Sequence, residues 1–254
     1  MVIDSQISKL PDNPHLEGYA IKNFAQSMLG DIVKGGMKMG KDIKEIKEFW
    51  ENCFKRSNID FKILARRDLS DIIERLNQYQ VKRVLDLGCG FGHWSIVLSK
   101  AGFRVTAVDI SSEAIRRVKT WANEERLSID TKVCLAQEIH SLMDKDFDAV
   151  ICNSVLDHMT FADASKVMQG IKDVLKPGGI AYLSFDGLEE GEDEVEKEFV
   201  VLEDGTRKYT KGNRKGMLWR FYTNEEIRIL CKYMEIIEFV EKCNGKREVW
   251  VRRK

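Results

Sequence analysis

Proline is scarce in this sequence, with three in 254 residues, and no run of apolar residues is long. A helix that crosses a membrane needs about 18 or more consecutive apolar residues, and no segment approaches that length. The N-terminus also lacks a compact apolar core next to basic residues, so we expect no signal peptide. These absences predict a cytoplasmic protein without a membrane span.

Net charge and paired cysteines are missing as well. Lys and Arg total 41, as do Asp and Glu, so the formal net charge is zero. This balance makes nucleic acid an unlikely partner, although a local basic patch stays open. The six cysteines include no C-x-x-C pair, and we interpret them as small hydrophobic residues in a reducing compartment. We therefore expect neither disulfides nor a metal site.

The stretch that organises the chain is residues 84–94, VLDLGCGFGHW. Its first four residues are mostly apolar, as in a strand buried on both faces. Gly88, Gly90 and Gly92 then allow positive φ and the close approach of a ligand to the backbone. A helix begins at about His93, and its free N–H groups point into the turn. The turn therefore suits an anionic or carboxylate-bearing ligand.

Two ligand classes compete for this turn. A dinucleotide cradle has the pattern G-x-G-x-x-G, from which the sequence departs because position 93 is histidine. The other pattern is D-x-G-x-G-x-G, which binds S-adenosylmethionine, and residues 86–92 match it throughout. Asp86 at the strand end suits a ligand with an ammonium group better than a pyrophosphate. A chance glycine turn in another kind of α/β protein is the remaining interpretation.

Strands and helices alternate from Arg83 onward, which implies right-handed crossovers and a parallel, doubly wound sheet. A hairpin signal at Asn244-Gly245 joins the final two strands, so we expect the sheet to end in an antiparallel pair. The predicted strands are 84–87, 104–110, 131–136, 147–153, 180–185, 235–242 and 247–253. The predicted helices are 93–100, 111–127, 161–175 and 223–234.

Residues 187–222 interrupt the alternation. A hairpin is expected around Asp204-Gly205, with an acidic segment before it and a basic segment after it. We interpret these charges mainly as solvated faces, with a basic lip for an anionic substrate as the alternative. The segment is thus a β-rich insertion.

The N-terminal residues form a helical extension in this interpretation. Residues 1–15 are a loose arm, and apolar periodicity predicts helices at 21–33, 43–54 and 64–76. Glycines near residues 35–40 interrupt them and resemble a hinge. These helices pack against the domain or, alternatively, close over a ligand. The residues that would line the pocket are Tyr19, Phe24 and Trp50.

With these motifs in view, the chain resembles the class I S-adenosylmethionine-dependent methyltransferases, in particular their small-molecule branch of the methyltransferase-11 type. The resemblance runs from about Trp50 to the C-terminus and is strongest over 84–153 and 175–185. It implies a Rossmann-like seven-stranded sheet whose last strand runs backwards. We divide the chain into an N-terminal extension or lid (1–60) and a methyltransferase domain (61–254) that carries the insertion 187–222.

The resemblance also implies a cofactor site for S-adenosylmethionine, with S-adenosylhomocysteine as the product. Asp86 and the turn 88–92 hold the methionine end, Asp109 accepts the ribose hydroxyls, and Ile110 packs on the adenine. After the third strand either Gln137 or Glu138 meets the adenine amino group. The full set of expected cofactor residues is Asp86, Gly88, Cys89, Gly90, Gly92, Asp109, Ile110, Gln137, Glu138, Ile139, Asn153 and His158.

Methyl transfer from a sulfonium needs alignment and exclusion of water more than acid–base groups. We therefore assign no catalytic base, with His158, Tyr222 and the acids near Asp186 as weak candidates; Tyr222 is also a possible substrate contact. The motifs of base-amine, cytosine and arginine methyltransferases are missing around residues 153–160. A small-molecule acceptor remains the first choice, with protein or RNA as alternatives. A nicotinamide-dependent oxidoreductase and a non-catalytic cofactor-binding protein complete the list, and the oligomeric state stays open.

Overall fold

The computed structural model describes residues 41–57, 68–141, 145–187 and 198–254. The predicted arm, the first helix (21–33) and the hinge lie outside these ranges. So do Tyr19, Phe24 and the acidic segment of the insertion.

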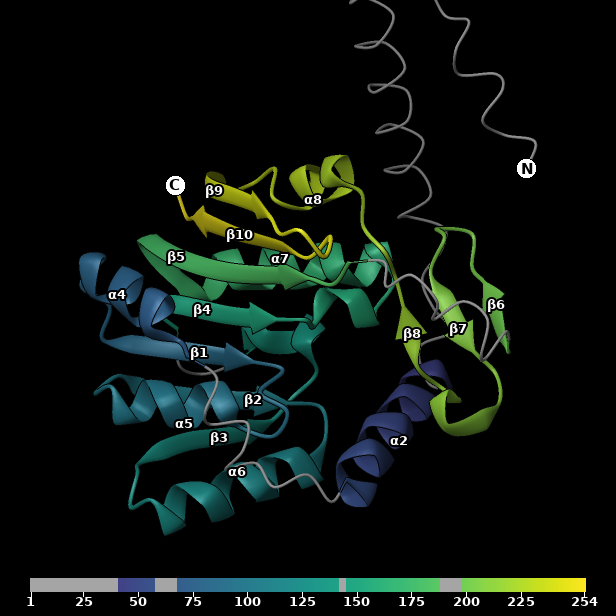
Figure 1. Ribbon diagram of the computed structural model, residues 1–254, viewed down its shortest axis with the longest axis horizontal. Helices are drawn as coiled ribbons and strands as arrows, with labels where there is room; N and C mark the ends of the chain where they lie inside the picture. The colour runs from purple at the N-terminus through teal and green to yellow at the C-terminus, as the bar shows by residue number, and fades with distance from the viewer. Residues whose placement is uncertain (1–40, 58–67, 142–144, 188–197) are drawn as a thin grey trace, which may run out of the picture. The chain divides into compact units, whose positions relative to one another are not determined.

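The core of the described chain is a seven-stranded sheet with the order β3-β2-β1-β4-β5-β10-β9 (Figure 1). Neighbours from β3 to β5 pair in parallel, whereas β10 is antiparallel to both β5 and β9. β10 is thus the one reversed strand, and the predicted fold class is confirmed. The strands are β1 (Arg83–Leu87), β2 (Arg104–Asp109), β3 (Ile129–Val133), β4 (Phe147–Asn153), β5 (Leu175–Phe185), β9 (Glu235–Glu241) and β10 (Arg247–Arg252).

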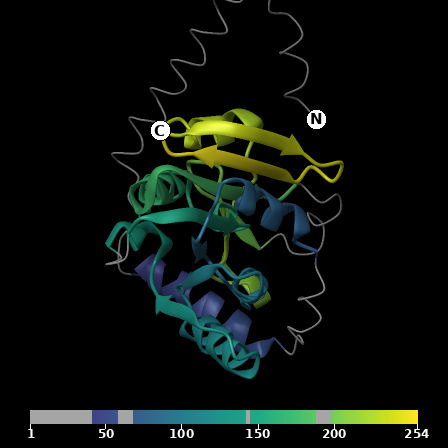
Figure 2. The ribbon, with the colours of Figure 1, turned by 90° about the vertical axis from the view of Figure 1, so that its left-hand side faces the viewer.

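Helices cover the sheet on its two faces (Figures 1 and 2). Apolar side chains of α4 and α5 share one buried cluster with β1, β4 and β5, which explains why β1 reads as a continuous apolar run. Capping starts two of the helices, since Ser111 accepts from the Ala114 N–H and Thr160 from the Asp163 N–H. The helices of the core are α4 (Ser70–Gln78), α5 (His93–Lys100), α6 (Ser112–Glu124), α7 (Phe161–Val174) and α8 (Asn224–Leu230).

Three predicted boundaries are wrong. The segment 175–179, predicted as a turn before a strand, belongs to β5, where the pairing with β4 shifts register and Gly178 adopts a φ of 78°. The third strand ends at Val133 instead of 136. The final helix stops at Leu230 instead of about 234, because a turn closes there with the Met234 N–H on the Cys231 carbonyl.

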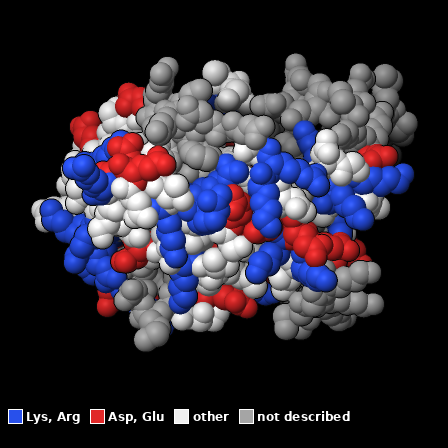
Figure 3. Space-filling model, turned by 90° about the horizontal axis from the view of Figure 1, so that it is seen from below, with Lys and Arg blue, Asp and Glu red and all other residues white. Residues whose placement is uncertain are grey.

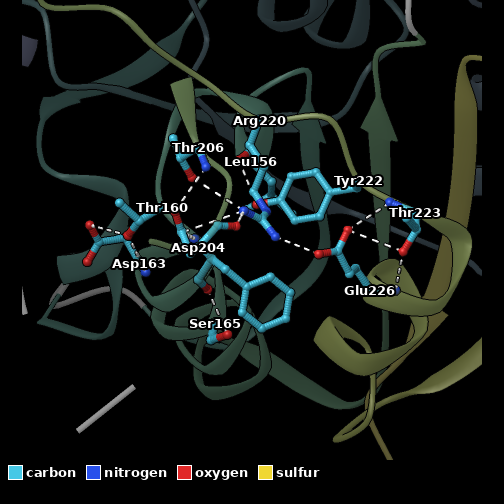
Figure 4. A network of polar contacts seen from close by, with 11 residues as sticks. Leu156, Thr160, Asp163, Ser165, Asp204, Thr206, Arg220, Tyr222, Thr223 and Glu226 are labelled. Carbon is cyan, nitrogen blue, oxygen red and sulfur yellow. Dashed lines mark hydrogen bonds and ion pairs between the residues drawn. The ribbon is translucent and has the colours of Figure 1, made fainter. Parts of the chain in front are cut away.

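The insertion forms a small antiparallel sheet of β6 (Phe199–Val201), β7 (Arg207–Tyr209) and β8 (Leu218–Trp219). The predicted hairpin is confirmed, with Gly205 at a φ of 86°. The buried guanidinium of Arg220 anchors this sheet by donating to the Asp204 carbonyl and to Glu226 at 2.5 Å (Figure 4). It also lies 5.3 Å from the ring centroid of Phe161.

The second predicted amphipathic helix is α2 (Lys41–Arg56). Two of its acids, Asp42 and Glu45, pair with Lys208 of β7 at 2.6 and 3.1 Å. At Gly216 an added Cβ would lie 2.9 Å from the Glu45 carbonyl, so the insertion and α2 are in close contact. The proposed division of the chain at residue 60 stays a prediction.

Candidate functional site

The glycine turn follows β1 at the carboxyl edge of the parallel strands. Gly88 and Gly92 have φ values of 71° and 86°, in the left-handed region that favours glycine. Space requires glycine as well: a Cβ at Gly88 would lie 2.5 Å from Val155, and one at Gly92 would lie 2.7 Å from Val118. The sequence pattern is therefore explained by both backbone conformation and packing.

Asp109, the last residue of β2, is tied to this turn. Its carboxylate accepts from the Gly90 N–H and from the Ser111 N–H, each at 2.9 Å. The N–H groups of Gly88 and Cys89 donate to the Val108 carbonyl at 2.8 and 3.0 Å. The ends of β1 and β2 are thereby locked together, with the Asp109 carboxylate beside the turn.

Asp86 lies beneath the turn and is 2% exposed. Its carboxylate accepts a hydrogen bond of 2.5 Å from the hydroxyl of Ser95 in the first turn of α5. Desolvation raises the pKa of Asp86 to about 7, and this effect outweighs the opposing bond from Ser95. A cationic group placed nearby would favour the ionised form.

A row of small polar groups follows β4. The Ser184 hydroxyl accepts from the Ser154 N–H at 2.9 Å and donates to Asn153 at 3.0 Å. Ser154 in turn donates to Asp186 at 3.1 Å and has a φ of 50°. The sequence pointed to Asn153 and Asp186 but missed the two serines, because serine in a strand carries no distinctive signal.

His158 lies where three parts of the fold meet. Its Nδ1 is 3.1 Å from the carbonyl oxygen of Leu218, which can only accept, so Nδ1 carries the proton and Nε2 the lone pair. The ring packs 4.8 Å from Trp50 of α2 and 6.0 Å from Trp219 of β8. Desolvation lowers the pKa of His158, so the neutral imidazole is favoured at physiological pH.

α2 also reaches the glycine turn. The ring of Phe54 is 3.6 Å from the position of a Cβ on Gly90 and 5.0 Å from the ring of Phe91. One turn earlier, Glu51 accepts hydrogen bonds at the N-terminus of α6. The sequence predicted the helix but neither of these residues, since a helical period does not identify the partner of a side chain.

The remaining predicted residues fall into two groups. Ile110 and Gln137 are partly exposed and Glu138 is exposed, so ligand contact is open to them. Ile139 is fully buried, and the Cys89 side chain packs in an apolar cluster, which leaves only the backbone of Cys89 for a ligand. Tyr222 is buried as well, and its hydroxyl donates to the Leu156 carbonyl at 3.1 Å.

Charges of both signs mingle on the face in Figure 3. Basic residues near the candidate site have acidic partners: Arg117 lies 2.9 Å from Glu113, and Lys55 lies 3.3 Å from Glu51. Within the described ranges no three His, Cys, Asp or Glu side chains group as a metal site, and no helix is long and apolar enough to cross a membrane.

Comparisons with known proteins agree with this geometry. Residues 84–179 match the model of a methyltransferase domain family. A ubiquinone biosynthesis O-methyltransferase of Xanthomonas campestris is 32% identical over 102 residues, which are 40% of this chain and 42% of that protein. The chain therefore matches less than half the length of this relative.

Solved structures give the same fold over more of the chain. An S-adenosylmethionine-dependent methyltransferase of Methanosarcina mazei aligns with a TM-score of 0.60 at 26% identity, covering 74% of this chain and 99% of the other. Magnesium protoporphyrin IX methyltransferase of Synechocystis, solved with bound S-adenosylhomocysteine, aligns with a TM-score of 0.57 at 18% identity over 82% and 94% of the two chains.

The reversed β10 and the aspartate–glycine turn define the class I methyltransferase architecture expected from the sequence. With the domain match, the chain belongs to the class I S-adenosylmethionine-dependent methyltransferases.

Proposed function

We propose that this protein transfers a methyl group from S-adenosylmethionine to a small-molecule acceptor. The observation that carries the proposal is the arrangement at the carboxyl edge of β1 and β2. There a buried acid, a turn of left-handed glycines and a second acid stand in one hydrogen-bonded unit. The first acid suits an ammonium group, and the second suits a pair of ribose hydroxyls.

The residues of this edge divide the cofactor among them. Asp86 and the turn from Gly88 to Gly92 hold the methionine end, and Asp109 holds the ribose. Ile110 forms a wall for the adenine, with Gln137 or Glu138 meeting its amino group and Ile139 supporting them from the core. Asn153 and His158 face the methyl end from β4 and the segment after it. S-adenosylmethionine would supply an electrophilic methyl group whose sulfur leaves as a neutral thioether.

The protein contributes alignment and exclusion of water. The aromatic rings of Trp50, Phe54 and Trp219 surround His158 and the turn, which supports an acceptor compartment with apolar walls on this side. The O-methyltransferase relative also favours a small molecule. We assign no catalytic base, although the Nε2 lone pair of His158 can accept a proton. We further propose a cytoplasmic location and a lid role for the N-terminal extension.

A nicotinamide-dependent oxidoreductase has less support, because the turn has His93 where a dinucleotide pattern needs glycine. Isothermal titration of the purified protein with S-adenosylhomocysteine, with NADH as the control ligand, separates the two. We expect micromolar binding of S-adenosylhomocysteine and none of NADH, and Asp109→Asn to weaken that binding. Binding of NADH alone would reject the proposal. Binding followed by no transfer to any acceptor would favour a non-catalytic protein.

A further inference from the structure

Glu51 of α2 receives three hydrogen bonds at the start of α6. Its carboxylate accepts from the hydroxyls of Ser111 and Ser112 at 2.7 and 2.9 Å and from the Glu113 N–H at 3.2 Å. Burial alone would raise the pKa of Glu51, but these bonds outweigh it and lower the pKa to about 2. Glu51 is thus ionised at physiological pH, at the positive end of a helix dipole.

Ser111 links Glu51 to the site. Its hydroxyl donates to Glu51 and also accepts from the Ala114 N–H at 3.2 Å as the cap of α6. Its own N–H donates to Asp109 at 2.9 Å. One residue therefore binds the carboxylate of Glu51 with its side chain and the carboxylate of Asp109 with its backbone.

This linkage has an electrostatic cost, because two carboxylates stand close together. The charge of Glu51 is one of the causes that raise the pKa of Asp109, after desolvation. A helix that only needed to pack could use a neutral residue here, such as glutamine. The charged contact suggests that the orientation of Ser111 matters beyond packing.

We propose that Glu51 is a positioning residue of the cofactor site, which holds Ser111 so that Asp109 presents its carboxylate to the ribose hydroxyls. The proposal rests on the ribose role of Asp109 in the proposed function. It makes α2 part of the cofactor site, together with the contact of Phe54 on Gly90.

The test compares Glu51→Gln with Glu48→Gln, a matched change at a 61% exposed side chain of the same helix. Binding of S-adenosylhomocysteine and of its 2′-deoxyribose analogue is measured by isothermal titration, and folding is checked by circular dichroism. We expect Glu51→Gln to weaken S-adenosylhomocysteine about tenfold, the size of one lost charge-assisted hydrogen bond. The same variant should weaken the deoxy analogue less than about threefold, because the analogue makes less use of Asp109.

Other outcomes overturn the proposal. Equal losses for the two ligands would mean that Glu51 only stabilises the fold, and no loss beyond that of Glu48→Gln would mean that it has no role in binding. Failure of the folded wild type to bind S-adenosylhomocysteine would reject the proposed function itself, and the role of Glu51 with it. If Glu51→Gln does not fold, Glu51→Asp keeps the charge with a shorter reach and should show the same ligand-dependent loss.

Discussion

The hydroxyl of Ser95 lies 2.5 Å from the carboxylate of Asp86, so the first turn of α5 holds the acid that ends β1. Because the pair is buried, the acid in the unliganded protein titrates near neutrality, with a pKa of about 7. Cofactor binding and folding should therefore both depend on pH through this one carboxyl group.

Binding of S-adenosylhomocysteine should strengthen about tenfold between pH 6 and pH 8, since its ammonium group prefers the ionised form of Asp86. Titration calorimetry in two buffers of different ionisation enthalpy measures the affinity and the protons released. Asp86→Asn should bind weakly at every pH in this range. An affinity of the wild type that does not change with pH would contradict the prediction.

The same group should destabilise the unliganded fold at high pH. In the unfolded chain Asp86 ionises near its ordinary pKa of 3.8, whereas in the native state it keeps its proton up to about pH 7. Its contribution to stability therefore falls as the pH rises through this window and is lowest above it. Asp86→Asn should raise the unfolding free energy at pH 8 by roughly 2 to 4 kcal/mol and leave it nearly unchanged at pH 4.

Urea denaturation of both proteins at the two pH values provides the measurement. Ser95→Ala is the useful control, because it removes a bond that favours the ionised acid and should lower stability at pH 8. Equal stability of wild type and Asp86→Asn at pH 8 would show that the acid is not destabilising.

Gly88→Ala should cost roughly 2 to 4 kcal/mol, since it combines a positive φ with a collision against Val155. The double variant Gly88→Ala/Val155→Ala should recover part of this loss, because the collision is relieved while the backbone strain persists. Gly102→Ala is the matched control: its φ is 92° but nothing lies within 4 Å of an added Cβ. Chemical denaturation of the three variants tests the comparison, and a Gly102→Ala loss as large as that of Gly88→Ala would leave packing without a part.

Arg220→Met should lower the unfolding free energy by roughly 3 to 5 kcal/mol, because Glu226 and the Asp204 carbonyl lose a buried cation (Figure 4). Arg228→Met, at an exposed position of α8, should cost less than about 1 kcal/mol. Thermal unfolding measures both. Below the transition, Arg220→Met should bind S-adenosylhomocysteine within threefold of wild type, and a larger loss would extend the role of Arg220 from the insertion to the cofactor site.

The sequence by itself determined the sheet, its reversed strand and the glycine turn. These features rest on local signals: apolar runs in strands buried on both faces, and glycines where φ is positive. It also placed Asp86 and Asp109 correctly at the ends of β1 and β2. The errors at 175–179 and 230–234 arose where pairing with a neighbouring strand or a closing turn decided the boundary.

Tertiary structure alone decided what the side chains touch. The contact of Glu51 with Ser111 joins residues 60 positions apart, and that of His158 with Leu218 also spans 60. No period or spacing encodes such pairs, because they depend on how α2 and the insertion pack against the carboxyl edge of the sheet. For the same reason the sequence could propose Tyr222 as a substrate contact, while packing directed its hydroxyl to the Leu156 carbonyl in the interior.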